Sequence, residues 1–228
     1  MIASKYYKPE ILACPKCKAR LVYRHAISNK KIYYSNGKQV KIHNLGYSCP
    51  KCSDGKIYAS QTANKISLRG ITYSTKIVCM IAKLKERHMS RDEICDFFYT
   101  KGIEISDRNI DNLYKRYKEY LQMDYKKKIP MAFEQMLKDY GQIRLSIDLI
   151  TVYDSIFIIV YDYFTFDILA FVCFNGLEDK NMNAFLESFL NPEAPITVIA
   201  SIRKDSYFIP LLKSLCSSKT KFIAYTKY

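Results

Sequence analysis

The chain has 228 residues, is 49% hydrophobic and carries a formal net charge of +14 from 36 Lys and Arg against 22 Asp and Glu. This composition excludes a disordered chain and allows one large domain or two to three small ones. The N-terminus is polar and charged, and no apolar run has spanning length, so we expect no signal peptide and no membrane partner. We therefore expect an intracellular protein, in the cytoplasm or nucleoid.

The charge changes abruptly along the chain. Residues 1–128 hold 27 basic and 11 acidic residues, whereas residues 129–228 hold 9 basic and 11 acidic ones. A generally basic, soluble protein would not show such a step at one boundary. The pattern predicts that the first part contacts a polyanion, with nucleic acid as the leading candidate, and gives no sign of a small-molecule substrate.

Four of the eight cysteines form two copies of the motif Cys-Pro-Lys-Cys. The first holds Cys14 and Cys17, the second holds Cys49 and Cys52, and 31 residues separate them. Each motif places two thiolates on a tight turn, and together they complete a tetrahedral site for Zn²⁺. A redox pair or two disulfides is the alternative, but the spacing and the expected reducing compartment favour structural zinc.

The segment between the motifs predicts an extended β-hairpin, so that residues 1–72 form a zinc ribbon. Short strands are expected at Leu21–Arg24, Lys31–Tyr34 and Gln39–Ile42, around the hairpin signal Asn36-Gly37. With four cysteines available as ligands, His25 and His43 are interpreted as surface or DNA-proximal residues. Residues 1–72 carry 14 basic and 2 acidic residues, which predicts that the ribbon also contacts nucleic acid.

Residues 73–124 show helical periodicity and predict three helices. The first spans Thr75–Arg87, and the second begins at a capping box of Ser90 and Glu93 and ends before Gly102. A short turn leads to the third helix, which begins after Ser106 and runs to about Met123. A helix-turn-helix and a plain three-helix bundle both fit this pattern, and the neighbouring basic ribbon favours the DNA-binding interpretation.

In a helix-turn-helix, the exposed residues of the third helix face the DNA. Arg pairs with guanine and Asn with adenine, while Lys and more distal Arg side chains suit phosphates. The candidate DNA-binding residues are Arg91, Arg108, Asn109, Asn112, Lys115 and Arg116.

The rest of the chain predicts a linker and a third domain. The basic run before Pro130 is typical of a linker, which we place at residues 125–140, followed by a domain at 141–228. The apolar runs of this domain predict an antiparallel meander of three strands, then a helix, a buried strand, a second helix and a last strand. The expected elements are Ile143–Ile150, Ser155–Tyr161, Phe166–Phe174, Asp179–Leu190, Ile196–Ser201, Ser206–Cys216 and Lys221–Thr226. The fold class is therefore multi-domain α+β, with helices flanking a mixed sheet.

This third domain resembles the ribonuclease-H-like core of the DDE transposases and retroviral-type integrases. The stretch Arg144–Asp148 and the following apolar run 157–169 are similar to the first two strands of that core. Ile196–Ile199 is similar to its fourth strand, and Ser206-Tyr207 to the start of the next helix. An N-terminal zinc ribbon and helix-turn-helix are also usual in such transposases. The resemblance implies binding of duplex DNA, action on paired ends by a homodimer, and a catalytic site of three carboxylates with Mg²⁺.

The chain departs from that catalytic pattern. Asp148 matches the first acid, but Ala200 and Ser201 stand where the second belongs, and Asp205 is a weaker candidate that also suits a helix N-terminus. Two-metal phosphoryl transfer needs converging carboxylates, so we expect no catalysis by this chain. The leading hypothesis is a transposase-like DNA-binding protein, degenerate or truncated, that needs Zn²⁺. The alternatives are an active recombinase fragment that uses Mg²⁺ with Asp148, and a zinc-ribbon transcription or RNA-associated factor.

Overall fold

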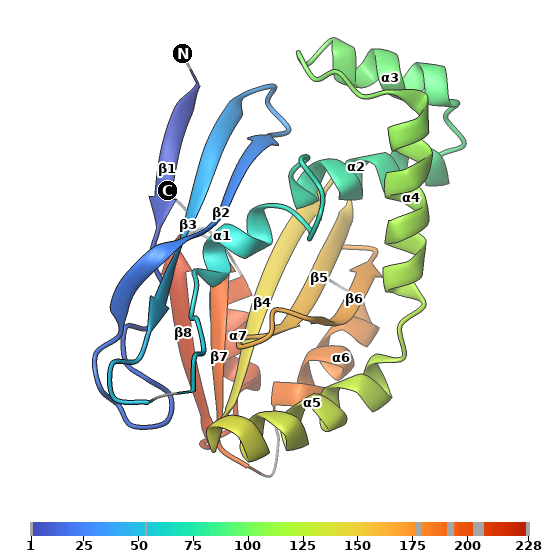
Figure 1. The fold of residues 1–228 in the computed structure, drawn as a ribbon. Helices are drawn as coiled ribbons and strands as arrows, with labels where there is room; N and C mark the ends of the chain where they lie inside the picture. Colours follow the sequence, from blue (N-terminus) through green and yellow to red (C-terminus); the bar gives the residue numbers. More distant parts are fainter. Residues whose placement is uncertain (1, 53, 177–178, 191–193, 203–207, 227–228) are drawn as a thin grey trace. The chain divides into compact units, whose positions relative to one another are not determined.

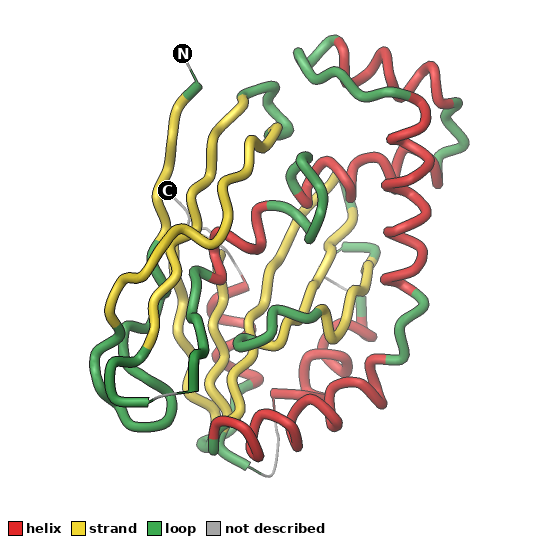
Figure 2. Tube along the Cα trace, viewed as in Figure 1, coloured by secondary structure: helices red, strands yellow, loops and turns green. Residues whose placement is uncertain are grey.

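The computed structural model describes residues 2–52, 54–176, 179–190, 194–202 and 208–226, with only the backbone described at 201, 202 and 226 (Figure 1). The chain divides into two compact units, Met1–Glu119 and Tyr120–Tyr228, and each is described by itself. Over the described residues the fold is α+β, with seven helices and two sheets, as Figure 2 shows by colour. None of the described helices is long and apolar enough to cross a membrane.

The first unit opens with a three-stranded sheet in the order β1-β3-β2. Strand β3 is central, since β1 pairs with it in parallel and β2 pairs with it antiparallel. On one face of this sheet Ile32, Ile42 and Ala63 form a buried apolar cluster, which joins the sheet to the short helix α1. The bounds of these elements are β1 Ala3–Tyr7, β2 Val22–Tyr33, β3 Gln39–Ser48 and α1 Gln61–Ile66.

The expected hairpin is present, but it is longer than the sequence suggested. Leu21–Arg24 and Lys31–Tyr34 were expected as separate short strands, whereas residues 22–33 form the single strand β2 with two irregularities in its register. Gly37 takes a positive φ of 78° at the turn, as its place after Asn36 predicts. Neither β1 nor α1 was expected from the sequence.

Three helices complete the first unit, close to their predicted bounds. They are α2 Thr75–Glu86, α3 Arg91–Tyr99 and α4 Asp107–Leu121. The predicted capping box is confirmed: the Ser90 side chain accepts from the backbone of Glu93, and the Glu93 carboxylate accepts from the backbone of Ser90 at 2.7 Å. These hydrogen bonds lower the pKa of Glu93. Gly102, with φ of 70°, lies in the turn between α3 and α4.

The hairpin and the helices belong to one unit because hydrogen bonds join them. The backbone N–H of Tyr33 donates to Thr72 O at 3.0 Å, and that of Ser74 donates to Tyr33 O at 2.9 Å. The hairpin turn also approaches the helical turn, since a Cβ at Gly37 would collide with the carbonyl oxygen of Lys101. The far end of the ribbon therefore contacts both the start of α2 and the turn before α4.

The second unit is a five-stranded mixed sheet in the order β6-β5-β4-β7-β8. Strands β4, β5 and β6 form the predicted antiparallel meander, and β7 and β8 continue the sheet in parallel. The predicted order of strands and helices is confirmed for the described residues. The bounds are α5 Tyr125–Tyr140, β4 Ile143–Val152, β5 Ser155–Asp162, β6 Ile168–Phe174, α6 Lys180–Leu190, β7 Ile196–Ile202, α7 Phe208–Leu215 and β8 Thr220–Thr226.

A large apolar core lies between this sheet and its helices. Alternate residues of β4, such as Leu145 and Ile147, face Phe185 and Leu186 of α6 and Leu212 of α7. Every residue of β5 is buried, as its continuous apolar run predicts for a strand between two others. The residues Arg144, Ser146 and Asp148 alternate with these positions on β4 and so occupy its opposite face.

The predicted linker is corrected by the structure. Residues 125–140 form helix α5, whose Ile129 and Met136 are buried in the core of the second unit. Pro130 lies inside this helix and removes one backbone hydrogen bond, a cost that burial of the two apolar side chains offsets. The side chain of Lys128 is also engaged, since its ammonium donates to Ile168 O at 2.6 Å. The basic run therefore marks the exposed side of an amphipathic helix.

Candidate metal centre and nucleic-acid interface

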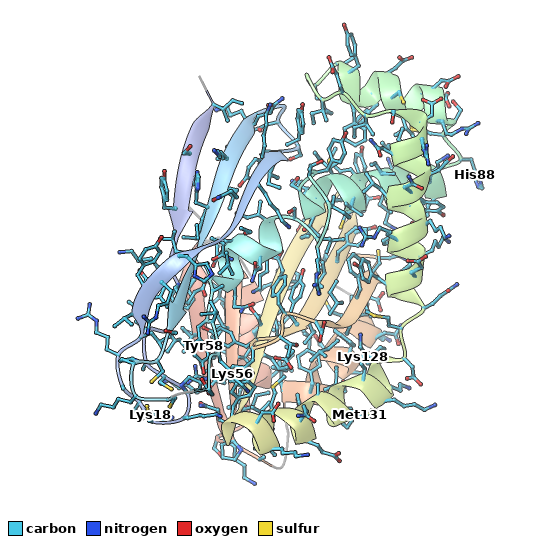
Figure 3. The ribbon with its side chains drawn as sticks, in the orientation of Figure 1. Lys18, Lys56, Tyr58, His88, Lys128 and Met131 are labelled. Carbon is cyan, nitrogen blue, oxygen red and sulfur yellow. The ribbon has the colours of Figure 1, made fainter. Side chains whose placement is uncertain are left out.

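The first Cys-Pro-Lys-Cys motif forms a tight turn closed by backbone pairing. A β-bridge joins Ala13 to Arg20, and inside it the N–H of Cys14 donates to Ala19 O at 2.8 Å. Lys18 follows the motif with a positive φ of 62°, and its N–H donates to Cys14 O at 3.0 Å. Figure 3 shows Lys18 beside the yellow sulfur atoms. The backbone thus turns sharply enough to place both thiols of the motif on the same side.

The second motif is closed in the same way at the end of β3. Tyr47 and Tyr58 form a bridge with N···O distances of 2.9 and 2.7 Å. Inside this loop the N–H of Cys52 points at the Cys49 sulfur at 3.4 Å. Burial tends to raise the pKa of Cys49, but backbone donors at Cys52 and Lys51 and the neighbouring thiols outweigh it and lower the pKa to about 7. The loop therefore favours a thiolate at Cys49, whereas the hydrogen bond to Cys17 and burial raise the pKa of Cys52, in the same loop, to about 12.

The two motifs bring four sulfurs together. All four Sγ atoms lie within 4.8 Å of one another. The Cys14–Cys52, Cys17–Cys49 and Cys17–Cys52 distances are 3.8, 3.4 and 3.5 Å. Zn–S bonds of about 2.3 Å in a tetrahedron would separate sulfurs by about 3.8 Å. The four cysteines predicted from spacing could therefore hold a metal ion such as zinc.

A half-buried carboxylate joins the segment before the first motif to the first helix. Glu10 accepts from Ser60 Oγ at 2.7 Å and from the backbone N–H groups of Gln61 and Thr62 at 2.9 and 2.8 Å. It thereby satisfies the unpaired donors at the N-terminus of α1. The other acid of residues 1–72, Asp54, pairs with Lys16 at 3.3 Å. Both acids of this basic segment are engaged in local structure.

Helix α4 exposes most of the predicted DNA-binding residues. Its buried face consists of Ile110, Leu113 and Tyr117. Arg108, Asn109, Asn112 and Lys115 are exposed, and Arg116 is half-buried beside the loop at Gly70. Arg91 is differently placed: its guanidinium pairs with Asp111 at 3.2 Å, and the same carboxylate pairs with Lys85 at 3.4 Å.

Two shallow cavities lie on either side of the start of α4. The larger, of about 440 Å³, brings together four of the predicted residues; its lining is Gly70, Ile71, Thr72, Tyr73, Asn109, Asn112, Leu113, Lys115, Arg116 and Glu119. The second, of about 400 Å³, lies towards α3. Tyr73 and Asn109 line both cavities. The hydroxyl of Tyr73 donates to Glu104 O at 3.0 Å, which fixes this ring beside the helix.

Sequence reasoning missed the loop Gly70–Tyr73. The loop approaches α4 because Thr72 and Ser74 pair with β2, which is a contact between segments far apart in sequence. A tyrosine just before a helix, such as Tyr73, gives no local sequence signal that the loop lies beside α4.

Among the described residues, the candidate acid Asp148 lies outside any cluster that could hold a metal ion. Asp148 lies on β4, is 1% exposed, and stands in register with Ile159 of β5 and Ser201 of β7. Asp205 and Ser206 lie outside the described residues. In the part of the chain that is described, the four cysteines form the one group of three or more His, Cys, Asp or Glu side chains that could hold a metal ion. Asp148 therefore belongs to no such group among those residues.

The sequence was compared with models of known protein families and with curated proteins. No family model matches the chain. No curated protein matches it either.

Proposed function

We propose that the chain is a transposase-like protein that binds duplex DNA through a zinc ribbon and a helix-turn-helix. The observation that carries this proposal is the exposed polar and basic face of α4. Arg108, Asn112 and Lys115 follow one another at helical spacing, opposite the buried Ile110 and Tyr117. The α2, α3 and α4 bounds, with Gly102 in the last turn, fit a helix-turn-helix whose third helix enters the major groove.

The chemistry of this face suits DNA. The guanidinium of Arg108 can pair with guanine, and the amides of Asn109 and Asn112 can pair with adenine. Lys115 and Arg116 lie further along the helix and suit phosphates. The edge of a DNA strand could lie in the larger cavity beside α4, next to these side chains.

The cysteine cluster supports a structural role for zinc in this proposal. The ribbon's apolar cluster of Ile32, Ile42 and Ala63 is small, and the two cysteine turns lie at the end of β3 and in the loop before β2. A metal held by four thiolates would join these loops and supply folding free energy that the cluster alone does not. Four cysteine thiolates would complete the tetrahedral coordination of the metal, so the site would have no open position for catalysis.

The second unit supports the ribonuclease-H-like part of the proposal. Its strand order, with an antiparallel meander followed by two parallel strands, agrees with the core that the resemblance implies, and Asp148 lies on the central strand. Ser201 pairs with Asp148 in the register and Ala200 with Ile147, at the positions where a second metal-binding carboxylate would be required. We therefore infer that the second unit is a degenerate core that carries the DNA-binding unit. If two DNA ends are held together, the protein would act as a homodimer.

Retention of genomic DNA tests the binding proposal. The purified chain is incubated with sheared DNA from its source at near-physiological salt, and the retained fragments are sequenced. We expect enrichment of a defined sequence, and enrichment of inverted repeats beside its own gene would assign it to transposition. Arg108→Ala should relax the preference at one base pair, by about 1–3 kcal/mol. Retention without sequence enrichment, or equal weakening of all sequences by Arg108→Ala, would contradict the recognition-helix assignment.

An active recombinase is the second candidate, and the central position of Asp148 favours it. Strand cleavage that depends on Mg²⁺ or Mn²⁺ and is abolished by Asp148→Ala would establish it. We expect no such cleavage, because one carboxylate cannot hold two metal ions.

A further inference from the structure

The outer face of the ribbon sheet carries an aromatic pair that the helix-turn-helix does not use. Tyr6 of β1, His43 of β3 and Asn29 of β2 stand in one row of the register. The rings of Tyr6 and His43 stack with centroids 4.4 Å apart and planes at 11°. Asn29 Oδ1 lies 2.7 Å from His43 Nδ1, which fixes the imidazole from its other side. The row is therefore pre-organised.

The Tyr6 ring has one face left for a ligand. Tyr6 is 67% exposed, although one face of its ring stacks on His43. Strand β1 is an edge of the sheet, and no described strand of this unit lies beyond it. An aromatic ring held in place by a neighbour and open on its second side loses little side-chain entropy when it stacks on a flat ligand.

The neighbouring row supplies positive charge on the same face. Lys41 pairs in register with Ser4 on one side and with Lys31 on the other. On each strand, this row lies two residues from the row of Tyr6, His43 and Asn29. A spacing of two residues keeps these lysines on the face of the aromatic row, opposite the apolar cluster. Both are exposed. The two acids of residues 1–72, Glu10 and Asp54, are engaged at α1 and at Lys16, so they do not neutralise this face.

We propose that this face binds single-stranded DNA, with an unpaired base stacked on Tyr6 and phosphates paired with Lys31 and Lys41. Base faces inside a duplex are covered by their neighbours, so an open aromatic ring selects an unpaired or terminal base. A basic surface beside such a ring follows the backbone of the strand. This inference rests on the proposed DNA binding for its choice of polymer, but it uses none of the residues of α4.

Fluorescence anisotropy of the full zinc-loaded chain tests the proposal. The probes are a labelled DNA strand of mixed sequence, its duplex, and an RNA strand of the same sequence. Tyr6→Ala should weaken binding of the single strand about tenfold and leave binding of the duplex unchanged. Tyr6→Phe keeps the ring and should bind like the wild type. Lys31→Ala and Lys41→Ala should each reduce the salt slope for the single strand by about 0.7.

Controls distinguish stacking from general effects. Tyr99 on α3 is 71% exposed, and Tyr99→Ala should leave single-strand binding unchanged. Zinc content and circular dichroism of each variant report whether it is folded. Equal weakening of both DNA forms by Tyr6→Ala, or loss with Tyr6→Phe, would overturn the stacking assignment. Tighter binding of RNA than of DNA would overturn the choice of DNA. Tyr6-dependent single-strand binding without any duplex binding would support this face while refuting the proposed function of α4.

Discussion

The two units divide charge and apolar core between them. Residues 1–119 hold 24 Lys and Arg against 10 Asp and Glu, whereas residues 120–228 hold 12 of each. The whole net charge of +14 therefore resides in the first unit. A polyanion would be attracted to that unit, while the second has no net charge with which to attract it.

The units also differ in what holds them together. In the ribbon part of the first unit, a small apolar cluster accompanies four thiols that could hold a metal. In the second unit, strand β5 is buried along its whole length, and the sheet packs within a large core against α5, α6 and α7. The comparison teaches that the first unit is arranged around surface chemistry and the second around burial, so different perturbations should unfold them.

Metal removal should produce the largest difference between the units. Chelation of zinc, or Cys49→Ser, should unfold the ribbon, because binding of structural zinc contributes about 10–16 kcal/mol in small zinc domains. The second unit should keep its fold, since its core uses no metal. For the wild type, elemental analysis should give one zinc per chain, and thermal unfolding followed by circular dichroism should show two transitions.

Cys216→Ser is the matched control for this experiment. Cys216 follows α7 in the second unit, and the variant should keep a full complement of zinc. Simultaneous loss of both transitions in Cys49→Ser would show that the second unit depends on the metal and would break the comparison.

A cavity in the second core should have the converse effect. Leu186 of α6 is fully buried, so Leu186→Ala should cost about 2–5 kcal/mol in the free energy of unfolding. The transition of the second unit should move to lower temperature, and the zinc content should stay unchanged. Loss of zinc from this variant would contradict separate stabilisation of the units.

The division into units explains which elements could be predicted. The strands of the second unit carry continuous apolar and β-branched runs, and the helices α2, α3 and α4 carry periodic faces with a capping box at Ser90. These are local signals, and the elements were found within a few residues of their bounds. Strand β1 and helix α5 were missed because their positions depend on pairing with β3 and on burial of Ile129 and Met136.

The candidate sites divide in the same way. The four cysteines were found because spacing alone specifies the ligand set. The cavity beside α4 was not predicted, because the loop at Tyr73 is placed by pairing with β2. The stacked pair of Tyr6 and His43 also depends on register between strands from distant parts of the sequence. No local pattern encodes such contacts.

The charge difference should appear in the salt dependence of duplex binding. Lys115 on α4 is exposed in the basic unit, and Lys115→Ala should weaken all duplexes alike and reduce the salt slope by about 1. Lys138 on α5 is an exposed lysine of the second unit, and Lys138→Ala should leave the slope unchanged. Anisotropy titrations over a range of salt concentrations measure both. A slope reduced by Lys138→Ala as much as by Lys115→Ala would show that the second unit also contacts phosphates, and an unchanged slope in Lys115→Ala would contradict the contact of α4 with phosphate.

The smallest effect concerns Asp162, a buried acid of the second unit. Asp162 ends β5, and its Oδ1 accepts from the backbone N–H groups of Phe164 and Thr165 at 2.6 and 3.1 Å. Burial nevertheless raises the pKa of Asp162, so the folded state disfavours the carboxylate. Stability should therefore fall as the pH rises from the unfolded value, about 3.9, through the raised folded value.

Asp162→Asn and Asp162→Ala separate the turn from the charge. The amide oxygen of Asn can accept both hydrogen bonds without carrying charge, so Asp162→Asn should gain stability relative to the wild type as the pH rises through this window. Asp162→Ala loses the acceptor and should cost about 1 kcal/mol. Denaturant unfolding at several pH values measures both differences. A wild type that gains stability over Asp162→Asn with rising pH would mean that the hydrogen bonds outweigh burial at this turn, and that even the apolar unit stabilises a charge.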